Sequence, residues 1–199
     1  TEEEHQEHYE AIVRESERLT WLVDNVLDYA SIEREATHYL LRANDLNETV
    51  RRVVDSLMMT LSMKEVNLDL KCLESELMIR HDADAVSQCV INLLSNAAKY
   101  GGEDHWIGMI VRRVFDGTEV AVSDKGMGIA PEEINKIFEP FYRTKPSRNR
   151  KGTGIGLSIV KHIIESHGGR VIVQSQLNKG TTVILHFPKE LMVQRENDV

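Results

Sequence analysis

The sequence has little cysteine and proline, and it has no long apolar run. Its 199 residues contain two cysteines and four prolines. Cys72 and Cys89 lack the close spacing of a metal-binding pair, which indicates buried thiols in a reducing compartment and argues against a disulfide framework. No segment approaches the roughly 18 apolar residues of a membrane-spanning helix, and the acidic start is unlike a signal peptide. We therefore expect a cytoplasmic chain that reaches a membrane only through segments beyond this sequence.

Positive charge is also scarce. Lysine and arginine number 24 against 32 acidic residues, for a net charge of −8, which argues against nucleic acid as a partner. With 41% hydrophobic residues, a chain of this length can form one packed core and an appended element. A phosphate-binding site in so acidic a chain has to be confined to one small part of the sequence.

Residues 1–34 contain neither glycine nor proline, and their apolar side chains repeat with helical spacing. Steps of three and four residues join the seam Tyr9, Ile12, Ser16, Leu19, Val23, Val26 and Ala30. Such a seam is typical of a coiled coil or a helical hairpin, because a lone helix cannot bury it. We expect a dimerisation helix, with a helix folded back on its own domain as the alternative.

From His38 onward, the pattern predicts alternating strands and helices. Period-two alternation and turn residues predict strands near 38–42, 66–72, 106–115, 118–123, 170–176 and 181–187. Helices are predicted from a cap at Asn44 or Asp45 to about Met63, from Asp82 or Asp84 to about Tyr100, and over 131–138 and 156–167. The fold class is an α/β two-layer sandwich, with helices on one face of a mixed, mostly antiparallel sheet and the long helix before it. The polar chain after Pro188 is expected to fray.

The helix predicted to end at Tyr100 has two distinct faces. Its apolar face belongs in the core and comprises Val86, Cys89, Val90, Leu93, Leu94 and Ala97. Another face carries Gln88, Asn92, Ser95, Asn96 and Lys99. Amide oxygens so placed can bind a hard cation, and the ammonium can meet phosphate. Taken alone, this polar stripe fits a solvated face as well.

A carboxylate and two glycines follow the strand predicted to end near Ser123. Asp124 can accept a hydrogen bond from an exocyclic amine, while Gly126 and Gly128 allow backbone to approach a flat ligand closely. A plain turn between a strand and a helix explains this segment equally well.

Residues 143–151 concentrate basic side chains in an acidic chain, namely Arg143, Lys145, Arg148, Arg150 and Lys151. A polyanion is their natural counterpart. They lead into Gly152, Gly154 and Gly156, where backbone amides at a helix start can hold phosphate oxygens. The spacing differs from the dinucleotide fingerprint, no Gly-Lys pair of a phosphate loop occurs, and the H-R-D and D-F-G motifs of protein kinases are missing.

Several methionines and histidines are expected to have packing, structural or surface roles. Met58, Met59 and Met63 are expected in the core or against a helical hairpin. His5 and His8 are expected to be solvated. None of the other six histidines has a ligand-like cluster around it, so surface or structural roles are expected for His38, His81, His105, His162, His167 and His186.

Four motifs in order resemble the N, G1, F and G2 boxes of sensor histidine kinases, within the GHKL ATP-binding superfamily. They are Asn92-Leu-Leu-Ser-Asn-Ala-Ala-Lys-Tyr100, Asp124-Lys-Gly-Met-Gly128, Ile137-Phe-Glu-Pro-Phe141 and Gly152-Thr-Gly-Ile-Gly-Leu157. Residues 9–34 resemble the second helix of that family's dimerisation and histidine-phosphotransfer hairpin. The resemblance implies a Bergerat-type ATP-binding fold with ATP and Mg²⁺ as cofactors.

The resemblance also implies roles for individual residues. Asn96 would bind Mg²⁺ with Asn92 close by, Lys99 would contact phosphate, and these three are the implied catalytic residues. Tyr100 would lie against the base or ribose, and Asp124 would accept from the adenine amine. The segment passing the ring would comprise Gly126, Met127, Gly128 and Ile129, with Lys125 standing where the family often has Asn. A mobile phosphate lid would include Arg143, Lys145, Gly152, Thr153, Gly154, Ile155, Gly156 and Leu157, and Thr182 would complete the adenine pocket.

These parallels imply three parts: residues 1–36 as one helix of an incomplete hairpin, 37–189 as the catalytic ATP-binding domain, and 190–199 as a polar tail. The family's acceptor motif, a His followed by an acid and then Pro, is absent, since Gln6 follows His5 and Tyr9 follows His8. The implied activity is transfer of the γ-phosphoryl group of Mg·ATP to a histidine outside this chain. The implied partners are a response-regulator receiver domain and a second copy of the chain, paired through the N-terminal helix.

Two other functions remain as alternatives. The ATP-hydrolysing relatives carry a Glu four residues before the metal-binding Asn, where this chain has Asn92, and an amide cannot take a proton from water. A nucleotide-sensing module without phosphotransfer is the second alternative. Anti-sigma-factor serine kinases lack support, because they do not carry the long heptad helix.

Overall fold

The computed structural model describes residues 38–63, 65–102, 104–144 and 153–193, together with residues 8, 9 and 16. The chain divides into two compact units, Thr1–Thr37 and His38–Val199. Most of the predicted N-terminal helix lies outside the described residues, so its dimer seam stays a prediction. Lys145, Arg148, Arg150, Lys151 and Gly152 also lie outside them.

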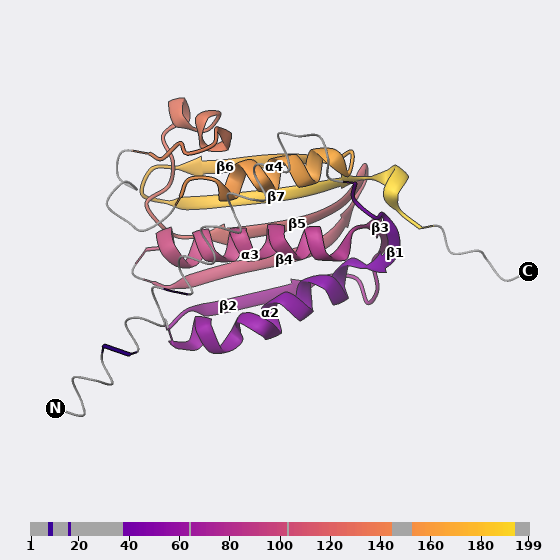
Figure 1. The fold of residues 1–199 in the computed structure, drawn as a ribbon, viewed down its shortest axis with the longest axis horizontal. Helices are drawn as coiled ribbons and strands as arrows, with labels where there is room; N and C mark the ends of the chain where they lie inside the picture. Colours follow the sequence, from indigo (N-terminus) through magenta and orange to yellow (C-terminus); the bar gives the residue numbers. More distant parts are fainter. Residues whose placement is uncertain are drawn as a thin grey trace, which may run out of the picture. The chain divides into compact units, whose positions relative to one another are not determined.

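The second unit is built on a five-stranded sheet, ordered β2-β4-β5-β7-β6. Its strands are β2 (Asn67–Cys72), β4 (Trp106–Val114), β5 (Gly117–Asp124), β6 (Arg170–Gln176) and β7 (Gly180–Pro188). β2 and β4 are parallel and the other pairs antiparallel. The helices α2 (Leu46–Met63), α3 (Ala83–Tyr100) and α4 (Gly156–Ser166) cover one face of this sheet (Figure 1). The predicted two-layer sandwich with a mixed, mostly antiparallel sheet is confirmed.

The core lies between the helices and alternate residues of the strands. On β5, Val120 and Val122 are buried opposite Val111 and Met109 of β4. The predicted apolar face of α3 is buried, from Val86 to Ala97. Cys89 belongs to this face, and burial raises the pKa of its thiol. Because the strands alternate, Glu119, Ser123 and their cross-strand neighbours lie on the sheet face away from the helices.

Both long helices begin at aspartates that the sequence indicates. Asp45 Oδ1 accepts hydrogen bonds from the N–H of Asn47 in α2 and of Leu77, both at 3.0 Å. Asp82 Oδ1 accepts from the N–H of Ala85 in the first turn of α3, at 3.1 Å. Each carboxylate supplies an acceptor for an amide that the helix itself leaves unpaired, and the two predicted caps are confirmed.

Some elements differ from the prediction. The first strand, β1 (Arg42–Asp45), lies further along the chain than predicted, because it pairs with the unpredicted strand β3 (Met78–His81). The helix predicted over 131–138 is instead two short 3₁₀ turns, η1 (Pro131–Glu133) and η2 (Lys136–Phe138). Ile134 and Asn135 separate them, and neither turn has a side-chain cap.

Two further predictions about packing need correction. Met59 and Met63 are 78% and 82% exposed, so they do not fill the core of this unit, and their packing against a helical hairpin stays a prediction. The chain after Pro188 does not fray at once, because it forms a 3₁₀ turn, η4 (Lys189–Leu191), and Met192 then pairs with Ile79 of β3. None of the helices that the structure describes is both long and apolar enough to cross a membrane.

Two buried histidines lie close to the start of α3. His167 Nδ1 donates to the carbonyl of Ile163 at 2.7 Å, so its Nε2 accepts from the N–H of Asp82. His81 Nδ1 lies 3.2 Å from the carbonyl of Ile79, and Nε2 lies 3.0 Å from Thr49 Oγ1. Burial lowers the pKa of both imidazoles below 6.5. Both histidines therefore have structural roles as neutral side chains.

Acidification is expected to destabilise this unit. Since the folded-state pKa values of His81 and His167 lie below the unfolded value, their contribution is complete above pH 6.5 and is lost as the pH falls below it. Urea unfolding at about pH 7.5 and about pH 5.5 measures the difference. The variant His38→Gln, which changes an exposed histidine, should keep the same pH dependence. A free energy of unfolding that is flat over this range would contradict the assignment.

Candidate functional site

The loop after β5 is held against the turn between β6 and β7. The N–H of Ile129 donates to Ser175 Oγ, and the N–H of Asn178 donates to the carbonyl of Met127, both at 2.8 Å. Ser175 Oγ in turn donates to the carbonyl of Gly180 at 3.0 Å. Residues 125–130 are thus positioned by the end of β6 and by the β6–β7 turn, which lie far from them along the chain.

Gly126 and Gly128 are required by close approaches of the chain to itself. A Cβ at Gly126 would collide with the backbone carbonyl of Tyr100 at the end of α3. Gly128 has a φ of +65°, and a Cβ there would collide with the carbonyl of Gln176. The approach of this loop to a flat ligand stays a prediction. The structure shows instead that the loop lies against the end of α3 and the end of β6.

The variant Gly126→Ala should be less stable by about 1–3 kcal/mol, because the added methyl group meets backbone atoms that cannot rotate away. The displaced loop should also weaken nucleotide binding. Urea unfolding and nucleotide titration measure the two effects. An alanine variant as stable as the parent would show that this contact is easily relieved.

Asp124, at the end of β5, is half-buried and is bonded through one oxygen. Its Oδ1 accepts from the N–H of Gly126 at 2.8 Å and from the N–H of Thr181 at 3.3 Å. Burial raises the pKa of this carboxyl, while the two amide donors oppose the shift. Among the described residues, both hydrogen bonds end on Oδ1, which leaves Oδ2 as the acceptor for a ligand.

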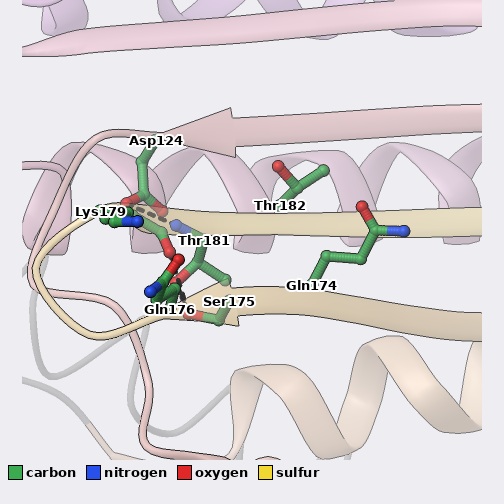
Figure 2. A pocket seen from close by; sticks show the side chains of 8 residues that line it. Asp124, Gln174, Ser175, Gln176, Lys179, Thr181 and Thr182 are labelled. Carbon is green, nitrogen blue, oxygen red and sulfur yellow. Dashed lines mark hydrogen bonds between the residues drawn. The ribbon is translucent and has the colours of Figure 1, made fainter.

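A shallow pocket of about 300 Å³ opens beside Asp124. Its lining comes from β5, β6, β7 and the β6–β7 turn, and comprises Asp124, Gln174, Ser175, Gln176, Lys179, Gly180, Thr181 and Thr182 (Figure 2). Strand alternation places Gln174 and Thr182 on the sheet face away from the helices, and Thr182 Oγ1 lies 2.9 Å from Ser123 Oγ. The amide that reaches Asp124 belongs to Thr181, directly before the predicted Thr182.

The predicted metal and phosphate residues of α3 lie toward its C-terminal half. Asn92 is 6% exposed, and its Oδ1 would lie 2.9 Å from a Cβ at Gly156, the first residue of α4. Asn96 is half-buried one turn later. Lys99 Nζ lies 4.7 Å from the centre of the Tyr100 ring. The structure therefore joins the amide face of α3 to the start of α4.

The start of α4 presents backbone amides without a side-chain cap. Ile155 is fully buried and anchors this end, while the half-buried Gly156 and Leu157 form the first turn. Unpaired amides at a helix start favour an anion, through both hydrogen bonds and the helix dipole. This geometry supports the predicted phosphate contact of the helix start.

The described ends of the predicted lid are held together. The N–H of Phe141 donates to the carbonyl of Gly154 at 3.1 Å, and Gly154 has a φ of +77°. Tyr142 Oη donates to Glu133 Oε1 at 3.1 Å. Arg143 and Thr153 are half-buried next to these contacts. Lys145 and Gly152 lie outside the described residues, so their assignment to the lid stays a prediction.

Residues 81–191 match the family described as "Histidine kinase-, DNA gyrase B-, and HSP90-like ATPase". The chain belongs to this family. It is similar to the sensor histidine kinase ZraS of Escherichia coli strain K12, at 31% identity over 90% of this chain and 37% of that protein. It is also similar to the sensor protein SrrB of Staphylococcus aureus strain N315, at 32% identity over 94% of this chain and 32% of that protein. The chain thus spans about a third of the length of these relatives.

Solved structures of this ATPase family share the fold. Full-length ShkA in complex with AMPPNP matches 90% of this chain and 38% of its own, with a TM-score of 0.76 and 26% identity. ThkA in complex with the response regulator protein TrrA matches 89% of this chain and 49% of its own, with a TM-score of 0.69 and 26% identity. The predicted ATP-binding fold and the resemblance to histidine kinase catalytic domains are confirmed. The roles of individual site residues stay predictions.

Proposed function

We propose that this chain binds Mg·ATP and transfers the γ-phosphoryl group to a histidine on a dimerisation helix outside the chain, for signalling to a response-regulator receiver domain. The half-buried Asp124 carboxylate, tied down through Oδ1 with Oδ2 left as acceptor, carries the nucleotide part of the proposal. The relatives named as sensor kinases, and ShkA with its bound AMPPNP, support it. In the intact protein, the chain would act as a homodimer in the cytoplasm.

The described residues fit an adenine nucleotide at two separate points. Asp124 Oδ2 would accept from the adenine amine, since a charged acceptor suits a neutral donor. The uncapped first turn of α4 would hold phosphate oxygens, with Lys99 and Arg143 supplying positive charge. The half-buried Asn96 would offer its amide oxygen to Mg²⁺, which offsets negative charge on the leaving diphosphate.

Catalysis in this proposal rests on positioning. The chain would fix the phosphates in line with the incoming histidine and exclude stray water, which is how phosphoryl transfer is generally accelerated. Hydrolysis would be slow, because Asn92 stands where ATP-hydrolysing relatives need a carboxylate. Asn92 is also buried against Gly156, so it lies in the α3–α4 contact.

ATP labelled on its γ-phosphate tests the function. The chain should bind Mg·ATP, leave itself unlabelled, and label an acceptor domain that carries the His-acid-Pro motif. The physical reason is that the sequence carries all four nucleotide-binding boxes but lacks the acceptor motif. Label on the added domain should be acid-labile and base-stable, as expected for a phosphohistidine.

Two outcomes would contradict parts of the proposal. Acid-labile label on this chain would mean that the acceptor lies within it, with His5 and His8 as the first residues to replace. Tight Mg·ATP binding without transfer to acceptor domains, including that of the natural partner sequence, would favour the nucleotide-sensing alternative. Rapid release of inorganic phosphate would favour the ATPase alternative.

A further inference from the structure

Asp82, the residue before α3, makes hydrogen bonds in three directions. Its Oδ1 accepts from the N–H of Ala85 at 3.1 Å, which caps α3. Its Oδ2 accepts from the N–H of Leu40 at 2.9 Å. Its own N–H donates to Nε2 of His167 at 3.1 Å, directly after α4. One residue therefore links the start of the second unit to the ends of two helices.

The charge on Asp82 suits this role. Burial alone would raise the pKa of its carboxyl, but the backbone N–H groups of Ala85, Leu40 and Asp84 outweigh burial and lower the pKa. The side chain is therefore an anion at neutral pH. Hydrogen bonds to a charged acceptor are about twice as strong as those between neutral groups.

His167 completes the arrangement from the other side. It is 2% exposed, and its ring packs against Tyr39, with the ring centres 5.3 Å apart. It also meets the ring of Phe187 edge-on at 6.4 Å. Because Nδ1 donates to the Ile163 carbonyl, the ring orientation is fixed and Nε2 remains an acceptor for Asp82. Consecutive residues, Tyr39 and Leu40, are thus both held.

These contacts lie where the two compact units meet in sequence. The first unit ends at Thr37 and the second begins at His38. We propose that Asp82 and His167 form an anchor that holds Tyr39 and Leu40, and so fixes the point from which residues 1–37 leave the ATP-binding domain. Asp82 and His167 are then positioning residues, outside the nucleotide site.

The anchor lies at the helix ends remote from the site residues. α3 starts at the anchor and carries Asn92 and Asn96 in its C-terminal half, whereas α4 starts at Gly156 and ends next to His167 (Figure 1). This part of the inference rests on the proposed function. Because the site residues lie at the other ends of these helices, a change at the anchor should leave the nucleotide site intact.

The variant Asp82→Asn separates the anchor from the helix cap. The amide oxygen of Asn can still accept from Ala85, and Asn is a good N-cap, but its NH₂ group then faces the N–H of Leu40. Exchange of the Leu40 amide hydrogen, followed by NMR, should become about ten- to a hundredfold faster. The urea midpoint should fall modestly, because a hydrogen bond to a charged acceptor is lost, while exchange at Ala85 and the affinity for Mg·ATP should stay close to those of the parent.

Asp84→Asn is the matched control. It removes the same charge from the first turn of α3, where Asp84 is exposed, and it should leave Leu40 exchange unchanged. Leu40 exchange that is unaltered in Asp82→Asn, or accelerated equally in both variants, would overturn the anchor. A parent chain that does not bind Mg·ATP would instead refute the proposed function, while the exchange data would still decide the anchor.

Discussion

Replacing Asp124 with Asn should weaken ATP binding by about tenfold to a hundredfold, while the domain stays folded. Two backbone donors, from Gly126 and Thr181, converge on Oδ1. The amide oxygen of Asn can accept both, which places its NH₂ group where Oδ2 was. That group presents a donor to the adenine amine, which is itself a donor. Because burial already disfavours the Asp124 anion, loss of the charge should not lower the free energy of unfolding.

Calorimetric titration with two nucleotides tests this geometry. ITP carries a carbonyl in place of the adenine amine, so it should bind the parent more weakly than ATP and lose little affinity in Asp124→Asn. Asp104→Asn is the control, since Asp104 is exposed and its carboxylate lies 3.8 Å from Nζ of Lys125. Equal losses of affinity for ATP and ITP would mean that the carboxylate does not bind the exocyclic amine of adenine.

Local rules explain why much of the fold is predictable. Asp45 and Asp82 are recognisable as caps because the amides they bond lie two and three residues later. Strand alternation on β5 and β7 is likewise visible in the sequence. The four-residue strand β3 is not, because it is defined by pairing with the distant β1. The 3₁₀ turns after Pro131 also depend on packing that helical spacing does not reveal.

The same distinction holds for the candidate site. Asp124 and the glycines can be found from sequence, because few residue types serve where a carboxylate meets close backbone. Thr181 and Ser175 act through cross-strand contacts, which no spacing along the chain displays. Strand register decides between the neighbouring threonines, since Thr181 reaches Asp124 while Thr182 bonds with Ser123. Gly126 is also needed because the backbone carbonyl of Tyr100 leaves no room for a Cβ, and the sequence interpretation did not foresee this contact.

Replacing Asn96 with Ala should remove most of the Mg²⁺ dependence of nucleotide binding and of phosphoryl transfer. Mg²⁺ takes oxygen ligands and keeps several waters, so a single protein amide beside the phosphates is a sufficient protein contribution. Loss of a partner in the outer shell of a metal already costs about tenfold to a hundredfold in affinity, and a direct ligand should cost at least as much. Binding of metal-free nucleotide should survive, because Asp124 and the start of α4 are untouched.

Two neighbours on α3 make this test specific. Ser95→Ala changes an exposed residue next to Asn96 and should leave the Mg²⁺ titration unaltered. Asn92→Ala should instead lower the free energy of unfolding, because Asn92 is 6% exposed and fills the contact with Gly156. A Mg²⁺ titration that is the same in Asn96→Ala and the parent would show that this face of α3 is merely solvated. The phosphates would then be neutralised by the basic residues and the α4 amides alone.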